Sequence, residues 1–194
     1  MRIIGGHWRG LSLAAVGKGD EAGRLRPTSD RVRESIFNIL MSMGRPPDGA
    51  QVLDLFAGSG ALGIEALSRG AAAATFVESD RRARTAIDAN LTATHLADRA
   101  TVFGRDVRAT LSALAGRGAR FDLVLVDPPY ALNAADLASV LAGIVEVTGN
   151  GAQVRLEQGS RLAAKVTWPD GLVQTGIRRY GDTVILEAER TETA

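Results

Sequence analysis

The sequence contains no cysteine, and its histidines are limited to His7 and His95. The absence of thiols excludes disulfides, thiolate metal sites and cysteine nucleophiles, and two imidazoles argue against a histidine metal cluster or a Ser-His-Asp hydrolase. No apolar run approaches the roughly 20 residues of a membrane span, and residues 1–7 lack a signal-peptide core. We therefore expect a cytoplasmic protein with no membrane partner and no bound metal, whose chemistry relies on carboxylates, backbone groups or a cofactor.

Charge is unevenly distributed along the 194 residues, although the formal net charge is only +1. Residues 1–45 hold eight lysines and arginines against four acidic residues, whereas the remainder holds 15 against 18. This asymmetry predicts a basic N-terminal extension over residues 1–45 that contacts a polyanion, followed by a main domain over residues 46–194. An ordinary solvated surface would explain the same charges. The candidate nucleic-acid contacts are Arg2, Trp8, Arg9, Arg24 and Arg26, of which Trp8 suits packing against the protein equally well.

Short apolar segments alternate with helical patterns from residue 51 onward, as in a parallel βαβ sheet. The expected strands are 51–56, 73–78, 100–103, 121–126 and 151–156, and the expected helices are 60–69, 81–95, 107–115 and 134–147. Two further strands, 172–180 and 183–188, flank the turn signal Gly181-Asp182. The fold class is thus α/β: a doubly wound, mostly parallel seven-stranded sheet that ends in an antiparallel hairpin.

The N-terminal extension has its own pattern. Residues 2–6 and 10–15 are glycine-punctuated and suit a small hairpin. After Pro27, Thr28 or Ser29 can cap a helix. The apolar positions of that helix follow helical spacing: Val32, Ile36, Phe37, Ile39 and Leu40.

A glycine loop follows the first expected strand and opens a helix. Gly58, Gly60 and Gly63 fit G-x-G-x-x-G, and Glu78 lies 20 residues beyond Gly58, which is also the spacing of a dinucleotide site. Asp54 argues against a nicotinamide cofactor, because a carboxylate beside a pyrophosphate is unfavourable. The sulfonium and α-ammonium groups of S-adenosylmethionine would instead be attracted to it.

Further residues around this loop are candidates for the same cofactor. The carboxylate of Glu78 can accept hydrogen bonds from ribose hydroxyls, and Phe56 belongs to the loop itself. Asp106 follows the third strand and could reach an adenine ring edge. It could equally be the N-cap of the helix that starts at Val107.

An Asp127-Pro128-Pro129-Tyr130 turn follows the nearly all-apolar fourth strand. Ligands of doubly wound sheets bind beyond the carboxyl ends of the strands where strand order reverses, so this turn and Gly58 should face one crevice. Asp127 and the carbonyl of Pro128 could accept both N–H groups of an exocyclic base amine and so direct its lone pair at a methyl donor. The prolines fix the backbone, and Tyr130 offers a stacking face. We interpret these four residues as the catalytic turn.

The sequence resembles amino-methyltransferases with a D-x-F-x-G-x-G loop and an [N/D]-P-P-[Y/F] turn, and in particular the RsmD-type 16S ribosomal RNA guanine-N2-methyltransferase family. The resemblance extends from residues 2–6 through the family-specific residues 26–38 to the loop, Glu78 and the Asp127 turn. It implies a bacterial enzyme that uses S-adenosylmethionine and acts on one guanine of 16S rRNA, within an assembled or assembling small ribosomal subunit. It also implies that Thr28, Arg33 and Phe37 cover the methionine end of the cofactor. We expect a monomer.

Three other functions remain open on the sequence. A DNA or RNA adenine-N6 methyltransferase could use the same turn, although the chain has no inserted domain to read a duplex. A nicotinamide-dependent reductase would account for the glycine spacing. An RNA-binding assembly factor could retain the cofactor fold without turnover.

Overall fold

The computed structural model describes residues 1–16, 30–44 and 47–192. Within them, seven strands form one sheet in the order β3-β2-β1-β4-β5-β7-β6. The first five strands in this order are parallel to one another, and β7 is antiparallel to both β5 and β6. This confirms the predicted doubly wound sheet with an antiparallel ending. The strands are β1 (Gln51–Leu55), β2 (Ala73–Val77), β3 (Ala100–Phe103), β4 (Phe121–Val126), β5 (Thr148–Gly159), β6 (Leu172–Tyr180) and β7 (Thr183–Arg190).

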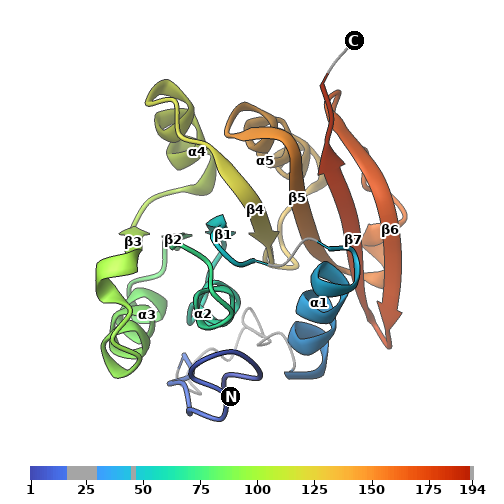
Figure 1. Ribbon diagram of the computed structural model, residues 1–194. Coiled ribbons are helices and arrows are strands. Elements are labelled where there is room, and N and C mark those ends of the chain that lie inside the picture. The colour runs from blue at the N-terminus through green and yellow to red at the C-terminus, as the bar shows by residue number, and fades with distance from the viewer. Residues whose placement is uncertain (17–29, 45–46, 193–194) are drawn as a thin grey trace.

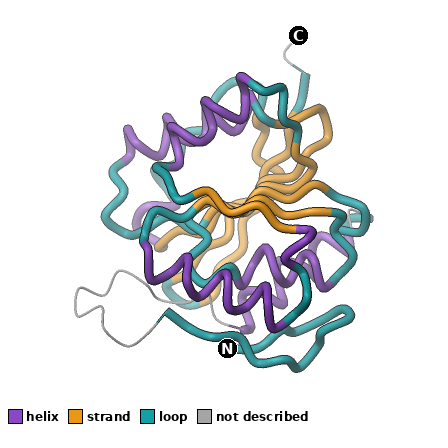
Figure 2. The backbone as a smooth tube through the Cα atoms, turned by 90° about the vertical axis from the view of Figure 1, so that its left-hand side faces the viewer, coloured by secondary structure: helices purple, strands orange, loops and turns teal. Residues whose placement is uncertain are grey.

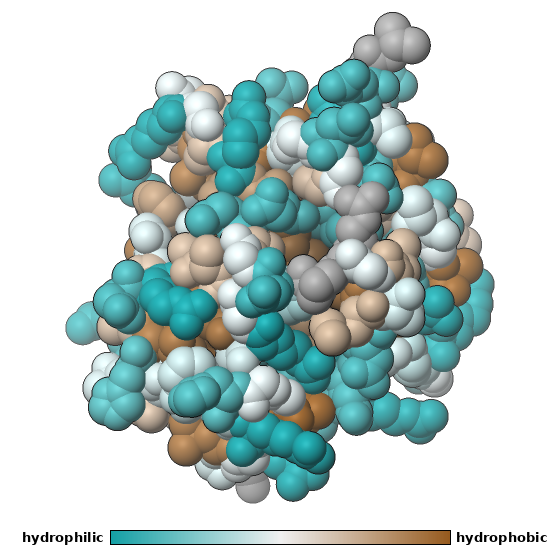
Figure 3. All heavy atoms as spheres, viewed as in Figure 1, coloured by the Kyte–Doolittle hydropathy of each residue, from teal (hydrophilic) through white to brown (hydrophobic). Residues whose placement is uncertain are grey.

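Helices cover both faces of the sheet, as Figures 1 and 2 show. One face packs against α1, α2 and α3, and the other against α4 and α5. On the surface seen in Figure 3, hydrophilic residues are spread widely, and hydrophobic residues form only small groups among them. No helix of the described residues is both long and apolar enough to cross a membrane. The helices are α1 (Asp30–Ser42), α2 (Ala61–Ser68), α3 (Arg81–Ala93), the short η1 (Ala97–Arg99), α4 (Val107–Gly116), α5 (Ala134–Glu146) and α6 (Ser160–Ala163).

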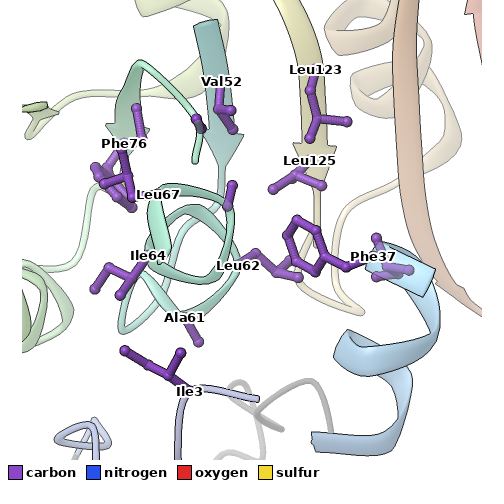
Figure 4. Close-up of a cluster of buried hydrophobic side chains, with 14 of the residues drawn as sticks. Ile3, Phe37, Val52, Ala61, Leu62, Ile64, Leu67, Phe76, Leu123 and Leu125 are labelled. Atoms are coloured by element: carbon purple, nitrogen blue, oxygen red, sulfur yellow. The ribbon is translucent and has the colours of Figure 1, made fainter. Parts of the chain in front are cut away.

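The first core joins the N-terminal segments to the sheet. Phe37 of α1 is fully buried, and its ring points toward Leu62 of α2 and Leu125 of β4 (Figure 4). Ile3 is buried in the same cluster. Burying a large apolar side chain is worth about 1.5–3 kcal/mol. The described residues before 45 therefore share a core with the sheet, while the predicted domain boundary at residues 45 and 46 falls outside the described residues and stays a prediction.

The predicted N-terminal hairpin forms only in part. A single bridge joins Arg2 to Ser12, and the amide of Ile3 donates to the carbonyl of Leu11 at 2.9 Å. The segment has no strand to extend it, and α2 instead supplies partners for its backbone. The buried carboxylate of Glu65 accepts the amides of Ile4 and Gly5, both at 2.8 Å. The two segments therefore pair as predicted, through backbone hydrogen bonds that include Gly10 N–H to the carbonyl of Ile3 at 2.8 Å and Leu13 N–H to that of Met1 at 3.0 Å, but they form no named strand.

Glu65 also holds α1 in place. Its Oε2 lies 3.6 Å from Nε of Arg33, and Oε1 accepts Nε of Arg69 at 2.8 Å. Both Arg33 and Glu65 have fully buried side chains. The guanidinium of Arg33 additionally donates to Asp30 at 2.9 Å and to the carbonyl of Arg2. One buried acid on α2 thus links the N-terminal loop and the first helix to the sheet.

Candidate functional site

The glycine loop, Glu78 and Asp127 meet at the carboxyl ends of three neighbouring strands. Leu55 at the end of β1 is paired with Val77 of β2 and with Val126 of β4. The strand order reverses between β1 and β4, which is where ligands of doubly wound sheets bind, and we call the space beyond these strand ends the crevice. The amide of Gly58 donates to Oε2 of Glu78 at 2.9 Å, and the amide of Asp127 donates to the carbonyl of Leu55 at 3.3 Å. The structure therefore brings these three predicted site elements together.

The glycines of the loop perform two different tasks. Gly58 has a φ of 56°, and a Cβ added to it would meet nothing within 4 Å. Open space therefore lies directly over its backbone. At Gly63 an added Cβ would lie 2.4 Å from Cε1 of Phe76, so this glycine is required for packing of α2 on the sheet. Phe56 also has a positive φ, 59°, which a non-glycine residue adopts at a cost of about 1–3 kcal/mol.

Asp54 lies beneath the loop with 1% of its surface exposed. Its Oδ2 accepts the amide of Gly63 at 2.8 Å, and Oδ1 is buried with no hydrogen-bond partner among the described residues. Burial raises the pKa of this carboxyl well above its ordinary range, the hydrogen bond from Gly63 lowers it, and the charges of Asp127 and Glu78 raise it further. Glu78 and Asp127 thus favour a cation over a pyrophosphate in the crevice, whereas Asp54 adds a negative charge only where it is ionised.

Glu78 is fixed from two sides. Its Oε1 accepts the amide of Asp80 at 2.8 Å and its Oε2 accepts that of Gly58, while only 8% of the residue is exposed. Each carboxylate oxygen can accept a second hydrogen bond. The open space over Gly58, the acceptors of Glu78 and the unpartnered Oδ1 of Asp54 together suit a ligand that carries hydroxyl donors and a positive charge.

The predicted catalytic turn follows β4, on the other side of the strand-order reversal from the glycine loop. Asp127 is half-buried, Pro128 is buried, and Tyr130 is 53% exposed at the rim. A Cβ added to Gly159, at the end of β5, would lie 3.3 Å from Cε1 of Tyr130, so the absent side chain leaves room for the ring. Sequence reasoning missed Gly159, because only the pairing of β5 with β4 brings it to this turn.

Several residues that were predicted to bind the cofactor have protein partners in the structure. Oδ1 of Asp106 accepts the amides of Arg108 and Ala109, so this residue is the N-cap that we held open as its alternative role. Arg33 and Phe37 are fully buried, and the guanidinium of Arg69 lies 5.0 Å from the Phe37 ring centroid. Their contacts with a cofactor stay predictions, and Thr28 lies outside the described residues.

Trp8 and Arg9 lie away from the glycine loop, whereas Met1, next to Arg2, contacts that loop, with its Sδ 4.0 Å from Oγ of Ser59. The amide of Trp8 donates to Oγ of Ser68, at the far end of α2 from the glycine loop. With eight residues in α2, this separation is about 12 Å along the helix. Trp8 packs against the first core and Arg9 is exposed beside it. Arg2 is exposed and lies 3.9 Å from Asp30.

The remaining predicted nucleic-acid contacts are Arg24 and Arg26. Arg24 and Arg26 lie outside the described residues, so RNA contact by the basic extension stays a prediction. Among the residues that the structure describes, no group of three or more histidine or acidic side chains could hold a metal ion.

The sheet order and the acidic crevice beside the glycine loop define a Rossmann-like methyltransferase. A solved structure described as the putative methyltransferase yhhF from Escherichia coli matches with a TM-score of 0.81 and 32% identity, over 98% of both chains. More particularly, the chain belongs to the family described as Conserved hypothetical protein 95, whose model matches residues 1–188. This is the family of RsmD-type methyltransferases, and the resemblance read from the motifs is confirmed.

Named relatives come from several bacteria. Ribosomal RNA small subunit methyltransferase D of Escherichia coli strain K12 is 48% identical over 130 residues, which is 67% of this chain and 60% of that protein. The putative rRNA methyltransferase YlbH of Bacillus subtilis is 46% identical over 131 residues, or 67% of each chain. The aligned part thus spans 60–67% of the length of these two relatives.

Proposed function

We propose that this chain transfers a methyl group from S-adenosylmethionine to the exocyclic N2 amine of a guanine in 16S rRNA of the small ribosomal subunit. The observation that carries the proposal is the placement of the Asp127 turn at the end of β4, across the strand-order reversal from the open space over Gly58. The family membership and the names of the relatives, which include ribosomal RNA small subunit methyltransferase D, support rRNA as the substrate.

The residues of the crevice suit S-adenosylmethionine. When bound, this molecule supplies an electrophilic methyl group on a sulfonium. Glu78 would accept hydrogen bonds from its ribose hydroxyls, and the backbone at Gly58 permits close approach because no side chain intervenes. In its ionised form Asp54, whose Oδ1 has no partner among the described residues, would favour the positive charge of the ligand.

The turn acts by positioning the acceptor. The Asp127 carboxylate and the Pro128 carbonyl accept the two N–H groups of the base amine, so that its lone pair points toward the methyl carbon. Methyl transfer would replace one amine proton by the methyl group, with the proton passing to water and the cofactor leaving as S-adenosylhomocysteine. Tyr130 stacks on the base, a contact worth about 1–3 kcal/mol. Such positioning can account for several kcal/mol of the barrier.

Methyl transfer tests the substrate directly. Labelled S-adenosylmethionine is incubated with small subunits from a strain that lacks the gene, and separately with duplex DNA. We expect label in 16S rRNA, at one guanine-N2 position when the modified nucleotide is mapped by mass spectrometry. Label in DNA alone, or on an adenine, would refute the proposal, and tight binding of NADH but not of S-adenosylhomocysteine in calorimetry would refute the cofactor.

Substitution of Asp127 tests the catalytic turn. Asp127→Ala removes the acceptor for the amine, and we expect the methylation rate to fall by about 100-fold or more with RNA affinity retained. Asp127→Asn keeps one carbonyl acceptor at the same place and should remain within about tenfold of the wild-type rate. An alanine variant within about threefold of the wild type would show that Asp127 does not position the acceptor.

A further inference from the structure

Three cationic residues lie at the end of the sheet where β5 and β6 have their carboxyl ends. Arg161 belongs to α6, Lys165 follows it, and Arg179 lies near the end of β6; all three are exposed. Residues 159–182 contain four lysines and arginines against two acids, Asp170 and Asp182. Of the four, Arg178 is paired with Glu187 at 2.9 Å, whereas the other three make no salt bridge within the described parts of the chain.

These three residues, the α6 patch, lie on one face of the sheet. Arg179 is paired with Val184 of β7, and directly opposite residues of antiparallel strands project to the same side. Val184 is buried in the second core together with Ala163 of α6. Arg179 therefore projects to the face that α6 covers, at the open edge of the sheet formed by β6 (Figure 1).

The α6 patch begins beside the catalytic turn. Gly159 is the N-cap of α6 and is also the residue whose missing side chain makes room for Tyr130. The amide of Ser160 donates to the carbonyl of Asp182 at 2.9 Å, which attaches the start of α6 to the β6–β7 turn. Arg161 is thus two residues from the glycine that contacts the stacking ring.

The other half of the crevice is occupied by the groups that suit the cofactor. Gly58 and Glu78 follow β1 and β2, on the opposite side of the Asp127 turn from β5. A nucleic acid whose base reaches Asp127 must therefore extend over the ends of β4 and β5, where the α6 patch lies. Arg9, by contrast, is located about one helix length from the glycine loop, beside the far end of α2.

We propose that the α6 patch binds the phosphates that flank the acceptor base. This inference rests on the proposed function, since it assumes an RNA substrate. Arginine and lysine beside an exposed stacking ring suit a single-stranded or flipped nucleotide, because the ring holds the base while the cations neutralise the adjoining backbone.

The salt dependence of binding tests the patch. Affinity for small subunits from the gene-deletion strain, and for protein-free 16S rRNA, is measured at several KCl concentrations for Arg161→Ala/Lys165→Ala. The matched control is Arg117→Ala/Arg120→Ala, which removes two exposed cations at the amino end of β4. Removing one cation that neutralises a phosphate should reduce the slope of log affinity against log salt by about 1, so we expect a reduction of about 2 for the patch variant and none for the control.

The outcomes separate this inference from the proposed function. Equal slopes for the patch variant and the wild type, with unchanged melting temperatures, would overturn the α6 patch as a phosphate site while leaving methylation of rRNA intact. Equal reductions in both double variants would also overturn it, because the effect would then reflect overall charge. Methylation of no rRNA by the wild-type chain would refute the proposed function itself.

Discussion

Replacement of Glu65 by alanine should release the N-terminal segments from the sheet. The carboxylate is fully buried, accepts the amides of Ile4 and Gly5, and lies against the equally buried guanidinium of Arg33. Removing one partner of a buried ion pair costs about 3–5 kcal/mol, and each unsatisfied amide adds about 1–3 kcal/mol. These costs are not additive because the loop can separate from α2 and expose its amides to water, so we expect a net loss of about 4 kcal/mol or more.

The two tryptophans report the two halves of the molecule separately. Trp8 packs on the first core beside α2, and Trp168 packs on the second core. Two single-tryptophan proteins are compared in urea unfolding: Trp168→Phe, which keeps Trp8, and Trp8→Phe, which keeps Trp168. When Glu65→Ala is added to each, the fluorescence of Trp8 should change at a lower urea concentration than that of Trp168. In the parent proteins we expect the two transitions to coincide.

An exposed acid provides the control. Glu146 lies at the end of α5 with an exposed side chain, and Glu146→Ala should change the free energy of unfolding by no more than about 0.5 kcal/mol. If Glu65→Ala is also within about 1 kcal/mol of its parent by both probes, Glu65 does not hold the N-terminal segments, and the reasoning from its contacts is wrong.

Two other substitutions test the glycine loop. Gly63→Ala places a Cβ 2.4 Å from Phe76 and should destabilise the protein by about 1–3 kcal/mol in urea unfolding. The control Gly116→Ala places a Cβ with nothing within 4 Å and should stabilise the protein by up to about 1 kcal/mol. Equal effects of the two substitutions would contradict the packing argument. The raised pKa of Asp54 means that the folded state binds more protons than the unfolded state, so wild-type stability falls as the pH rises from the unfolded pKa through the folded one. Asp54→Asn cannot ionise and should gain stability relative to the wild type over that interval; a difference that is constant between about pH 4 and pH 8 would contradict the assigned shift.

Sequence periodicity predicted the sheet because its strands are short, apolar and separated by helices with clear apolar faces. The four helices between the strands were placed within two residues of their observed bounds. The start of β5 was missed, since Thr148 pairs with Phe121 through an irregular register over polar residues that lack an alternating pattern. The pairing of the two N-terminal segments was predicted, but the contacts of Ile4 and Gly5 with the Glu65 side chain were not, because Glu65 lies about 60 residues away in the sequence.

The crevice was predictable to the extent that its residues follow strands in sequence. Gly58, Glu78 and Asp127 each follow a buried strand, and parallel strands bring their carboxyl ends to one edge. Gly159 and Glu65 carry no comparable signal, because their roles depend on which strand or loop lies beside them. The burial of Arg33 was also hidden, since an arginine next to Asp30 in a helix has the pattern of a solvated ion pair.

Under the proposed function, the negative charge of the crevice determines what charge the RNA-binding surface outside it must have. Glu78 and Asp127 favour a cationic methyl donor, but the same carboxylates repel the phosphates of an approaching RNA. A neutral base can enter such a crevice only if its flanking phosphates remain outside and are held there by cations. The ends of β4 and β5 meet this requirement, with Tyr130 at the rim and the α6 patch directly beyond Gly159. Under the proposed function, the carboxylates that favour the donor therefore require cations outside the crevice to hold the RNA phosphates. The α6 patch supplies such cations on the β5 side of the crevice.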